Sequence, residues 1–280
     1  MILKTFQLIK GLGPKTENKL WEAGFRDWYD ILKKSRPTGI PVSKYDMLKT
    51  FLTELREIYS KRDYLTLNEL IPKKVKWRMI PELLGQIAYL DIETTGLYWP
   101  ESCITTIAVY DGNNTNNFIR GKNLDEFPKF ISKFPAIATY YGKCFDIPFI
   151  KNEMKMKFPQ VHFDLCFLLR RLGLTGGLKK VEKRLRIFRN DLEEVDGYVA
   201  VILWHKYRRT KDPRYLETLL AYNTEDVINL EYMLYYAYNG LIRRESLPFK
   251  PLKLPKKDID RPYKVHKEIL KDLLKGAQFY

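Results

Sequence analysis

The chain has 280 residues, of which 49 are Lys or Arg and 34 are Asp or Glu, so its formal net charge is +15. Hydrophobic residues make up 45% of the sequence, enough to bury a core, but no apolar run approaches the ~18 residues of a membrane span, which excludes a membrane channel and a disordered chain. The length suits about two domains of ~150 residues each.

The sequence predicts a helical N-terminal segment followed by an α/β pattern. Residues 1–62 are expected to be helical with short turns, and residues 63–82 to be a basic linker interrupted by prolines. The pattern then changes, and the expected elements are strands at 86–92, 104–110 and 117–120, a helix at 123–133, a strand at 136–141, a helix at 145–156, a strand at 161–164 and helices over 165–238. Residues 243–280 form a Pro- and Lys-rich extension with a last helix at 263–275. This order predicts an α/β domain over 83–242.

Two weaker signals bear on where the protein is located. The apolar run at the N-terminus is too short for a secretory signal. Cys103, Cys144 and Cys166 are odd in number and form no C-x-x-C pair, which predicts reduced, mostly buried thiols rather than disulfides or zinc ligands. We therefore expect a cytoplasmic protein that does not bind membranes.

The positive charge is unevenly distributed. Residues 1–82 carry +7, residues 83–242 carry +2, and residues 243–280 carry +6. Such an excess suits nucleic acid, because each neutralised phosphate releases counterions. It equally suits a well-solvated or thermophilic surface, so charge alone leaves both interpretations open.

Acidic residues interrupt apolar segments at three places. Asp91 and Glu93 end the first strand, and the period of two places both on one face, where two carboxylates repel each other unless a cation lies between them. Asp146 lies where a strand turns into a helix, and Asp226 lies in a late helix with Tyr222 one turn before it. Together the four carboxylates would form an oxygen-donor site for Mg²⁺ or Mn²⁺. Taken singly, each also fits a strand end, a helix cap or an exposed helical pair.

These segments, at 91–94, 145–149 and 222–226, resemble the three motifs of the DEDDy exonucleases. They are most similar to the proofreading domain of family B DNA polymerases and to small stand-alone proteins predicted to be ribonuclease H-like exonucleases, over about residues 85–238. The DEDDh branch would have a histidine where this chain has Ala221. The resemblance implies a ribonuclease H-like mixed five-stranded sheet flanked by helices.

The resemblance also implies 3′-to-5′ hydrolysis of phosphodiester bonds with two Mg²⁺ or Mn²⁺ ions. The implied catalytic residues are Asp91, Glu93 and Asp226 on the metal that activates water, with Asp91 also on the second metal, Asp146 reaching a metal through water, and Tyr222 orienting the attacking water. The motifs further imply that Thr94, Tyr141 and Phe145 contact nucleic acid, although relatives usually have Asn in place of Tyr141. A single-stranded substrate is expected, because an unpaired end can enter the carboxylates while its bases stack on aromatic side chains, which make up 14% of the sequence. DNA is favoured over RNA only by analogy. The alternatives are an endonuclease or RNA exonuclease on the same fold, or a catalytically weak nucleic-acid-binding module.

The N-terminal segment resembles a helix-hairpin-helix motif at residues 9–25. Gly11 and Gly13 would let backbone N–H groups approach a phosphate, and Lys15 and Lys19 would add charge. Glu17 replaces the usual small residue, and the alternative is a module that packs or binds protein. The basic C-terminal extension is expected to wrap the domain rather than cross a nucleic-acid groove.

Overall fold

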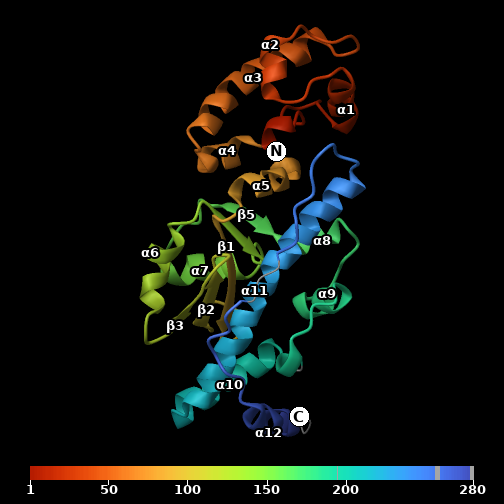
Figure 1. Cartoon of the computed structure of the whole chain (residues 1–280). Coiled ribbons are helices and arrows are strands. Elements are labelled where there is room, and N and C mark those ends of the chain that lie inside the picture. Colours follow the sequence, from red (N-terminus) through yellow and green to blue (C-terminus); the bar gives the residue numbers. More distant parts are fainter. Residues whose placement is uncertain (194, 256–258, 278–280) are drawn as a thin grey trace. The chain divides into compact units, whose positions relative to one another are not determined.

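The computed structural model describes residues 1–193, 195–255 and 259–277. The chain divides into two compact units: an N-terminal unit of Met1–Leu84 with Pro159–Val161, and a C-terminal unit of Gly85–Phe158 with His162–Tyr280. Figure 1 colours the two units along the sequence. Each unit buries hydrophobic residues of its own.

In the part of the N-terminal unit that precedes residue 85, the regular elements are all helices, joined by turns and short loops. Its elements are η1 (Ile2–Lys4), α1 (Pro14–Glu22), α2 (Trp28–Lys33), α3 (Val42–Ser60), α4 (Tyr64–Leu70), η2 (Lys73–Met79) and α5 (Ile80–Leu83). Asp27 caps α2 and Asp63 caps α4, because each carboxylate accepts hydrogen bonds from backbone N–H groups of the first turn. Trp28 and Leu48 are fully buried in the core of this unit.

The segment 63–82, which the sequence predicts to be a linker, is folded. It forms α4, η2 and α5 and belongs to the N-terminal unit. Lys73 and Lys74 are exposed, whereas Val75 and Trp77 are buried. The two prolines do not prevent helix formation, because Pro72 precedes η2 and Pro81 lies in the first turn of α5, where a missing N–H costs no helical hydrogen bond.

The C-terminal unit is built on a mixed five-stranded sheet, as the sequence predicts. The strands are β1 (Ile87–Thr94), β2 (Ile104–Tyr110), β3 (Thr115–Ile119), β4 (Ala136–Thr139) and β5 (Val161–Asp164), in the order β3-β2-β1-β4-β5. β2 pairs antiparallel with both β1 and β3, and β4 pairs parallel with β1. β1 is therefore the central strand (Figure 1).

Helices cover both faces of this sheet, which confirms the α/β fold class. They are η3 (Leu124–Glu126), α6 (Phe127–Ile131), α7 (Asp146–Met154), α8 (Leu165–Arg170), α9 (Leu178–Arg184), η4 (Asn190–Leu192), α10 (Gly197–Thr210), α11 (Pro213–Arg244) and α12 (Lys267–Ala277). α6 and α7 share a core with the strands, and the long α11 packs against β1 and β2 (Figure 1). Aspartates cap α8, α10 and α11 at Asp164, Asp196 and Asp212.

The described part of the C-terminal extension packs along α11. Asn239 exchanges two 2.7 Å hydrogen bonds with the backbone of Leu252. Arg261 forms an ion pair with Glu225 at 2.8 Å, and Ile269 of α12 is buried in the core that α10 and α11 share. These residues pack against the unit, in agreement with the expected wrapping. Residues 256–258, which include two lysines of the extension, fall outside the described part of the chain.

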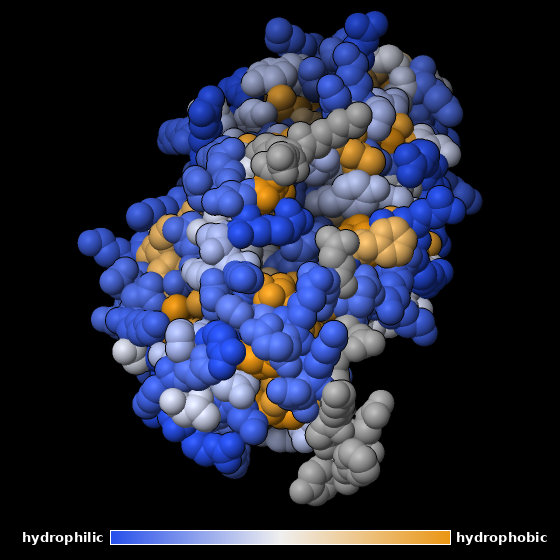
Figure 2. All heavy atoms as spheres, turned by 60° about the horizontal axis from the view of Figure 1, so that its bottom comes forward, coloured by the Kyte–Doolittle hydropathy of each residue, from blue (hydrophilic) through white to orange (hydrophobic). Residues whose placement is uncertain are grey.

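Hydrophilic side chains cover most of the face in Figure 2, and the apolar ones form small separate patches. None of the described helices combines the length and the apolar character that crossing a bilayer requires. All three cysteines are free, but Cys144 is exposed, contrary to the expectation of mostly buried thiols, because it lies in the turn that leads into α7.

Candidate metal centre

The alternation of β1 turns two carboxylates toward α11. Leu90 and Ile92 belong to the core that β1 forms with α6 and α7. Asp91 and Glu93 therefore point to the opposite face, because successive side chains of a strand alternate. There Asn223 of α11 donates a hydrogen bond of 2.7 Å to Asp91. This contact fixes the orientation of the Asp91 carboxylate.

A third carboxylate comes from α11. Asp226 follows Asn223 by one helical turn and is 3% exposed. One oxygen from each of Asp91, Glu93 and Asp226 lies within 4.8 Å of the other two. We call these three residues the carboxylate cluster. Three largely buried hard oxygen donors around one point fit the ligand preference of Mg²⁺ or Mn²⁺ and disfavour a soft metal such as Cu(I).

Asp146 lies beside this cluster but is not one of its three members. It is the first residue of α7, follows the N-cap Phe145, and is buried. Its carboxylate accepts a hydrogen bond of 3.2 Å from the backbone N–H of Ile92, between the two acidic residues of β1. The strand-to-helix junction thus brings Asp146 near the cluster, at a position from which its charge reaches Asp91 and Glu93.

Burial and mutual repulsion favour the protonated forms of these groups in the metal-free protein. Burial, followed by repulsion from Asp226, raises the pKa values of Asp91 and Glu93 well above their ordinary range. Burial raises the pKa of Asp146 to about 7. It raises the pKa of Asp226 to about 6, against the opposing charge of Arg189. A divalent cation would offset the repulsion that, after burial, raises the pKa values of Asp91 and Glu93.

Metal affinity is therefore expected to depend on pH. Protonation removes negative charge that attracts a cation, so lowering the pH through a pKa of about 7 at Asp146 and about 6 at Asp226 weakens binding. We expect Mn²⁺ to bind roughly tenfold more weakly at pH 6 than at pH 8, as titration calorimetry would measure. In Asp146→Asn the same comparison should show a smaller difference, since one group whose pKa lies in this range no longer titrates. An undiminished dependence in that variant would contradict the assignment.

Tyr222 lies against the cluster, one turn before Asp226. It is 6% exposed, and burial raises the pKa of its phenol well above the usual value, with the charge of Asp226 adding to the shift. Two cations approach its ring, because Lys179 Nζ lies 5.3 Å and Arg189 Cζ 5.7 Å from the ring centroid. The phenol is thus protonated at neutral pH and can donate or accept a hydrogen bond next to the carboxylates.

Arg189 is a residue of this site that sequence reasoning missed. It is 4% exposed and forms an ion pair with Asp226, while its Nη2 lies 2.6 Å from Glu182 of α9. Nothing in the local sequence distinguishes it from the many other basic residues around it. Only the fold brings it to α11.

The three expected nucleic-acid contacts near the cluster differ in exposure. Tyr141 is 47% exposed and has a left-handed backbone with φ of 65°. Thr94 is buried and donates its hydroxyl hydrogen bond to the carbonyl of Gly96. Phe145 is half-buried, and its ring lies 5.7 Å from that of Phe149 in the core. Tyr141 is therefore the one of these three whose side chain is open to a ligand.

Tyr141 lies on a surface of aromatic and basic side chains, of which Phe167 is half-buried and the others are exposed. Its ring centroid lies 6.4 Å from that of Phe167 on α8. Lys143 Nζ and Arg170 Cζ lie 5.9 and 5.6 Å from the same Phe167 ring. Asp164 fixes the loop by accepting backbone hydrogen bonds from Tyr141 and Lys143 at 3.0 and 2.9 Å. This anchoring stabilises a conformation that a non-glycine residue seldom adopts.

The hairpin residues of the N-terminal unit are accessible. Gly11 has a φ of +85° and Gly13 is the N-cap of α1, while Lys15 and Lys19 are exposed on that helix. Glu17 is instead fully buried, where it accepts hydrogen bonds from Gln7 Nε2 at 2.6 Å and from the backbone N–H of Phe6 at 2.7 Å. Glu17, the residue that departs from the motif, therefore makes its contacts in the core of this unit.

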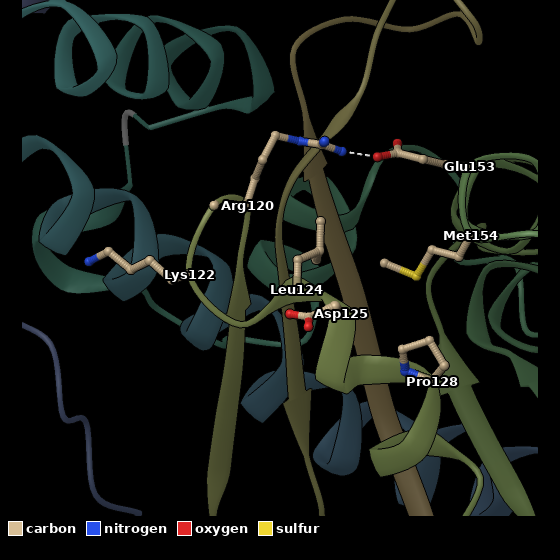
Figure 3. Close-up of a pocket in the computed structure, with 8 residues that line it drawn as sticks. Arg120, Lys122, Leu124, Asp125, Pro128, Glu153 and Met154 are labelled. Carbon is tan, nitrogen blue, oxygen red and sulfur yellow. Dashed lines mark ion pairs between the residues drawn. The ribbon is translucent and has the colours of Figure 1, made fainter.

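A hollow of about 490 Å³ lies elsewhere in the C-terminal unit, between the end of β3 and α7. Figure 3 shows Arg120 reaching across it to an ion pair with Glu153. Glu153 also accepts a 2.8 Å hydrogen bond from the backbone N–H of Ile104. The acidic residues here, Asp125 and Glu153, are thus separate from the carboxylate cluster, and the ion pair ties α7 to the sheet.

Comparison with known proteins agrees with this arrangement. The chain is 29% identical over 126 residues to the uncharacterized protein YprB of Bacillus subtilis (strain 168), and the match covers 39% of this chain and 30% of that protein. The matched part is therefore less than a third of the relative's length. No solved structure matches the chain. Residues 88–238, which include the carboxylate cluster and Asp146, match the RNase_H superfamily, and the chain belongs to this superfamily.

Proposed function

We propose that this protein is a metal-dependent 3′-to-5′ exonuclease of the DEDDy type that acts on single-stranded nucleic acid, with DNA favoured over RNA. The observation that carries the proposal is the meeting of Asp91, Glu93 and Asp226 within 4.8 Å in a buried site. RNase H-like domains are typically nucleases that use divalent metals, and this cluster offers the oxygen donors that such metals require. Burying three mutually repelling carboxylates costs free energy, and a bound cation would offset that cost, whereas a purely structural role would not.

Each residue near the cluster has a role in this proposal. Asp91, Glu93 and Asp226 would hold two Mg²⁺ or Mn²⁺ ions, whose charge would stabilise the entering and leaving oxygens of the phosphodiester. Asn223 keeps the Asp91 carboxylate in place through its 2.7 Å hydrogen bond. Tyr222, protonated and adjacent to Asp226, orients the attacking water. Asp146 contributes charge through water and binds no metal directly.

The surface of Tyr141, Lys143, Phe167 and Arg170 supports a single-stranded substrate. The exposed ring of Tyr141 could stack on an unpaired base, at roughly 1–3 kcal/mol per base, and the cations beside it could contact phosphates. Tyr141 lies five residues before Asp146 in the chain, so the surface and the metal centre share one loop and helix. A paired terminus would leave the Tyr141 ring without a base to bind.

The N-terminal hairpin would contact the phosphate backbone. Lys15 and Lys19 are exposed beside Gly11 and Gly13, at the start of α1, where the helix dipole also favours an anion. If both lysines contact phosphates, Lys15→Gln/Lys19→Gln should reduce the slope of log K against log salt by about 1–2 for single-stranded DNA, as fluorescence anisotropy would measure.

A matched control for that experiment removes the same charge from the same unit. Lys61 and Lys74 are exposed outside the hairpin, so Lys61→Gln/Lys74→Gln should leave the salt slope near that of the unchanged protein. Equal slopes for the two double variants would instead favour a hairpin that packs or binds protein.

The test of the proposed activity is a panel of 5′-labelled DNA and RNA oligonucleotides with Mg²⁺, Mn²⁺ or EDTA. The proposal expects a ladder of products that shorten by one nucleotide from the 3′ end, faster on single strands, and no products with EDTA. Discrete internal cuts would mean an endonuclease. A gel shift without cleavage would mean a binding module.

A further inference from the structure

Arg189 is a buried cation that pairs with one of the three carboxylates of the proposed metal centre. Its guanidinium is buried, and Nη1 forms an ion pair with Asp226 of the carboxylate cluster. Nε and Nη2 both lie 2.6 Å from Glu182 Oε2. Asn229 donates a hydrogen bond of 2.9 Å to Glu182 Oε1, so both Glu182 oxygens have partners. The guanidinium is thus clamped between two carboxylates.

Buried partners on two helices and a backbone hydrogen bond hold Arg189 and Glu182 in this arrangement. Glu182 lies on α9 and Asn229 on α11, and both are buried. The backbone N–H of Arg189 donates a hydrogen bond of 2.8 Å to Glu193, which fixes the main chain as well. Because an arginine keeps its proton at any accessible pH, its charge persists whether or not a metal is present.

We propose that Arg189 is an internal counter-ion that competes with the divalent metal for Asp226 and so sets the metal affinity of the site, while Glu182 limits this competition. The inference rests on the proposed metal binding but not on nuclease activity. A guanidinium and a metal draw on the same negative charge, so a fixed positive charge beside the cluster weakens metal binding. Glu182 offsets part of that charge.

The two residues therefore have opposite effects on the same measurement. Arg189→Gln keeps hydrogen-bonding capacity but removes the positive charge, so Mn²⁺ should bind about tenfold more tightly. Glu182→Gln leaves the positive charge of Arg189 uncompensated, so Mn²⁺ should bind about tenfold more weakly. If Arg189 served only to hold Asp226 in position, its loss would loosen a ligand and weaken Mn²⁺ binding instead. The direction of the change thus distinguishes the two roles.

The experiment is calorimetric titration of the full-length chain with Mn²⁺ alone, at pH 8 and fixed ionic strength. Arg209→Gln serves as the control, because Arg209 is exposed on α10 and carries the same charge. The double variant Arg189→Gln/Glu182→Gln removes both charges of the buried pair and keeps the test valid if Arg189→Gln alone does not fold. It should bind Mn²⁺ at least as tightly as the unchanged protein.

The outcomes separate this inference from the proposed function. Tighter binding by Arg189→Gln, weaker binding by Glu182→Gln and no change in Arg209→Gln would establish the counter-ion. Unchanged or weaker binding by Arg189→Gln would overturn it, and so would weaker binding by the double variant. If the unchanged protein itself binds no Mn²⁺, the proposed metal centre fails, and the inference fails with it.

Discussion

Asp91→Asn is expected to lower the rate of Mn²⁺-dependent nucleotide release from a 3′ end by on the order of a thousandfold. The amide keeps the shape of the side chain and can still accept the hydrogen bond from Asn223, so the fold should survive. It lacks the negative charge that a metal ligand supplies. Steady-state cleavage of a 5′-labelled oligonucleotide measures the rate, and circular dichroism checks the fold.

Asp125→Asn is the matched control for that substitution. Asp125 is exposed and lines the hollow beside Arg120, outside the carboxylate cluster. The control should retain a rate within about twofold of the unchanged protein, since most surface substitutions change little. Comparable rates for Asp91→Asn and the unchanged protein would refute the proposed role of the cluster.

Arg78→Met is expected to destabilise the N-terminal unit by about 3–5 kcal/mol. Arg78 and Glu17 form an ion pair at 2.9 Å, and their side chains are 0% and 1% exposed. Removing the arginine leaves a buried carboxylate without its cation, which costs much more than the loss of a surface pair. Hydrogen exchange of peptides from residues 1–84, in the full chain, measures the change in the free energy of local unfolding.

The double variant Arg78→Met/Glu17→Gln distinguishes the buried charge from lost packing. It leaves no unpaired charge, and the amide oxygen that replaces the Glu17 carboxylate could still accept the hydrogen bond from the backbone of Phe6. We expect it to recover a large part of the stability that the single variant loses. Equal losses in the two variants, or a loss below about 1 kcal/mol in Arg78→Met, would contradict the attribution of the loss to an unpaired buried carboxylate.

The parts of the fold that local spacing determines could be predicted from the sequence. The period of a strand alone places Asp91 and Glu93 on one face, and the structure turns that face toward α11. Apolar strands and helical periodicity likewise predict an α/β order, and the resemblance to ribonuclease H-like exonucleases implies the mixed sheet that the structure has. Glu17 was recognisable as a departure from the hairpin motif, but its reason, a buried contact with Arg78, depends on the fold.

The parts that depend on distant contacts could not be predicted. Segment 63–82 has the composition of a linker, yet Val75 and Trp77 are buried because the rest of the N-terminal unit provides a core for them. Arg189 looks like any solvated arginine in the sequence, and only its approach to Glu182 and Asp226 distinguishes it. A charged residue becomes recognisable as part of a site only when its partners are known.

The most direct measurement of the central claim is anomalous X-ray diffraction from crystals grown with Mn²⁺ and an oligonucleotide with a free 3′ end. We expect an anomalous peak at about 2.0–2.3 Å from oxygens of Asp91, Glu93 and Asp226, typical of a hard divalent cation with oxygen ligands. We also expect the peak to disappear in Asp91→Asn crystals. No peak at the carboxylate cluster at millimolar Mn²⁺, or a peak at Glu153 alone, would contradict the proposed metal centre.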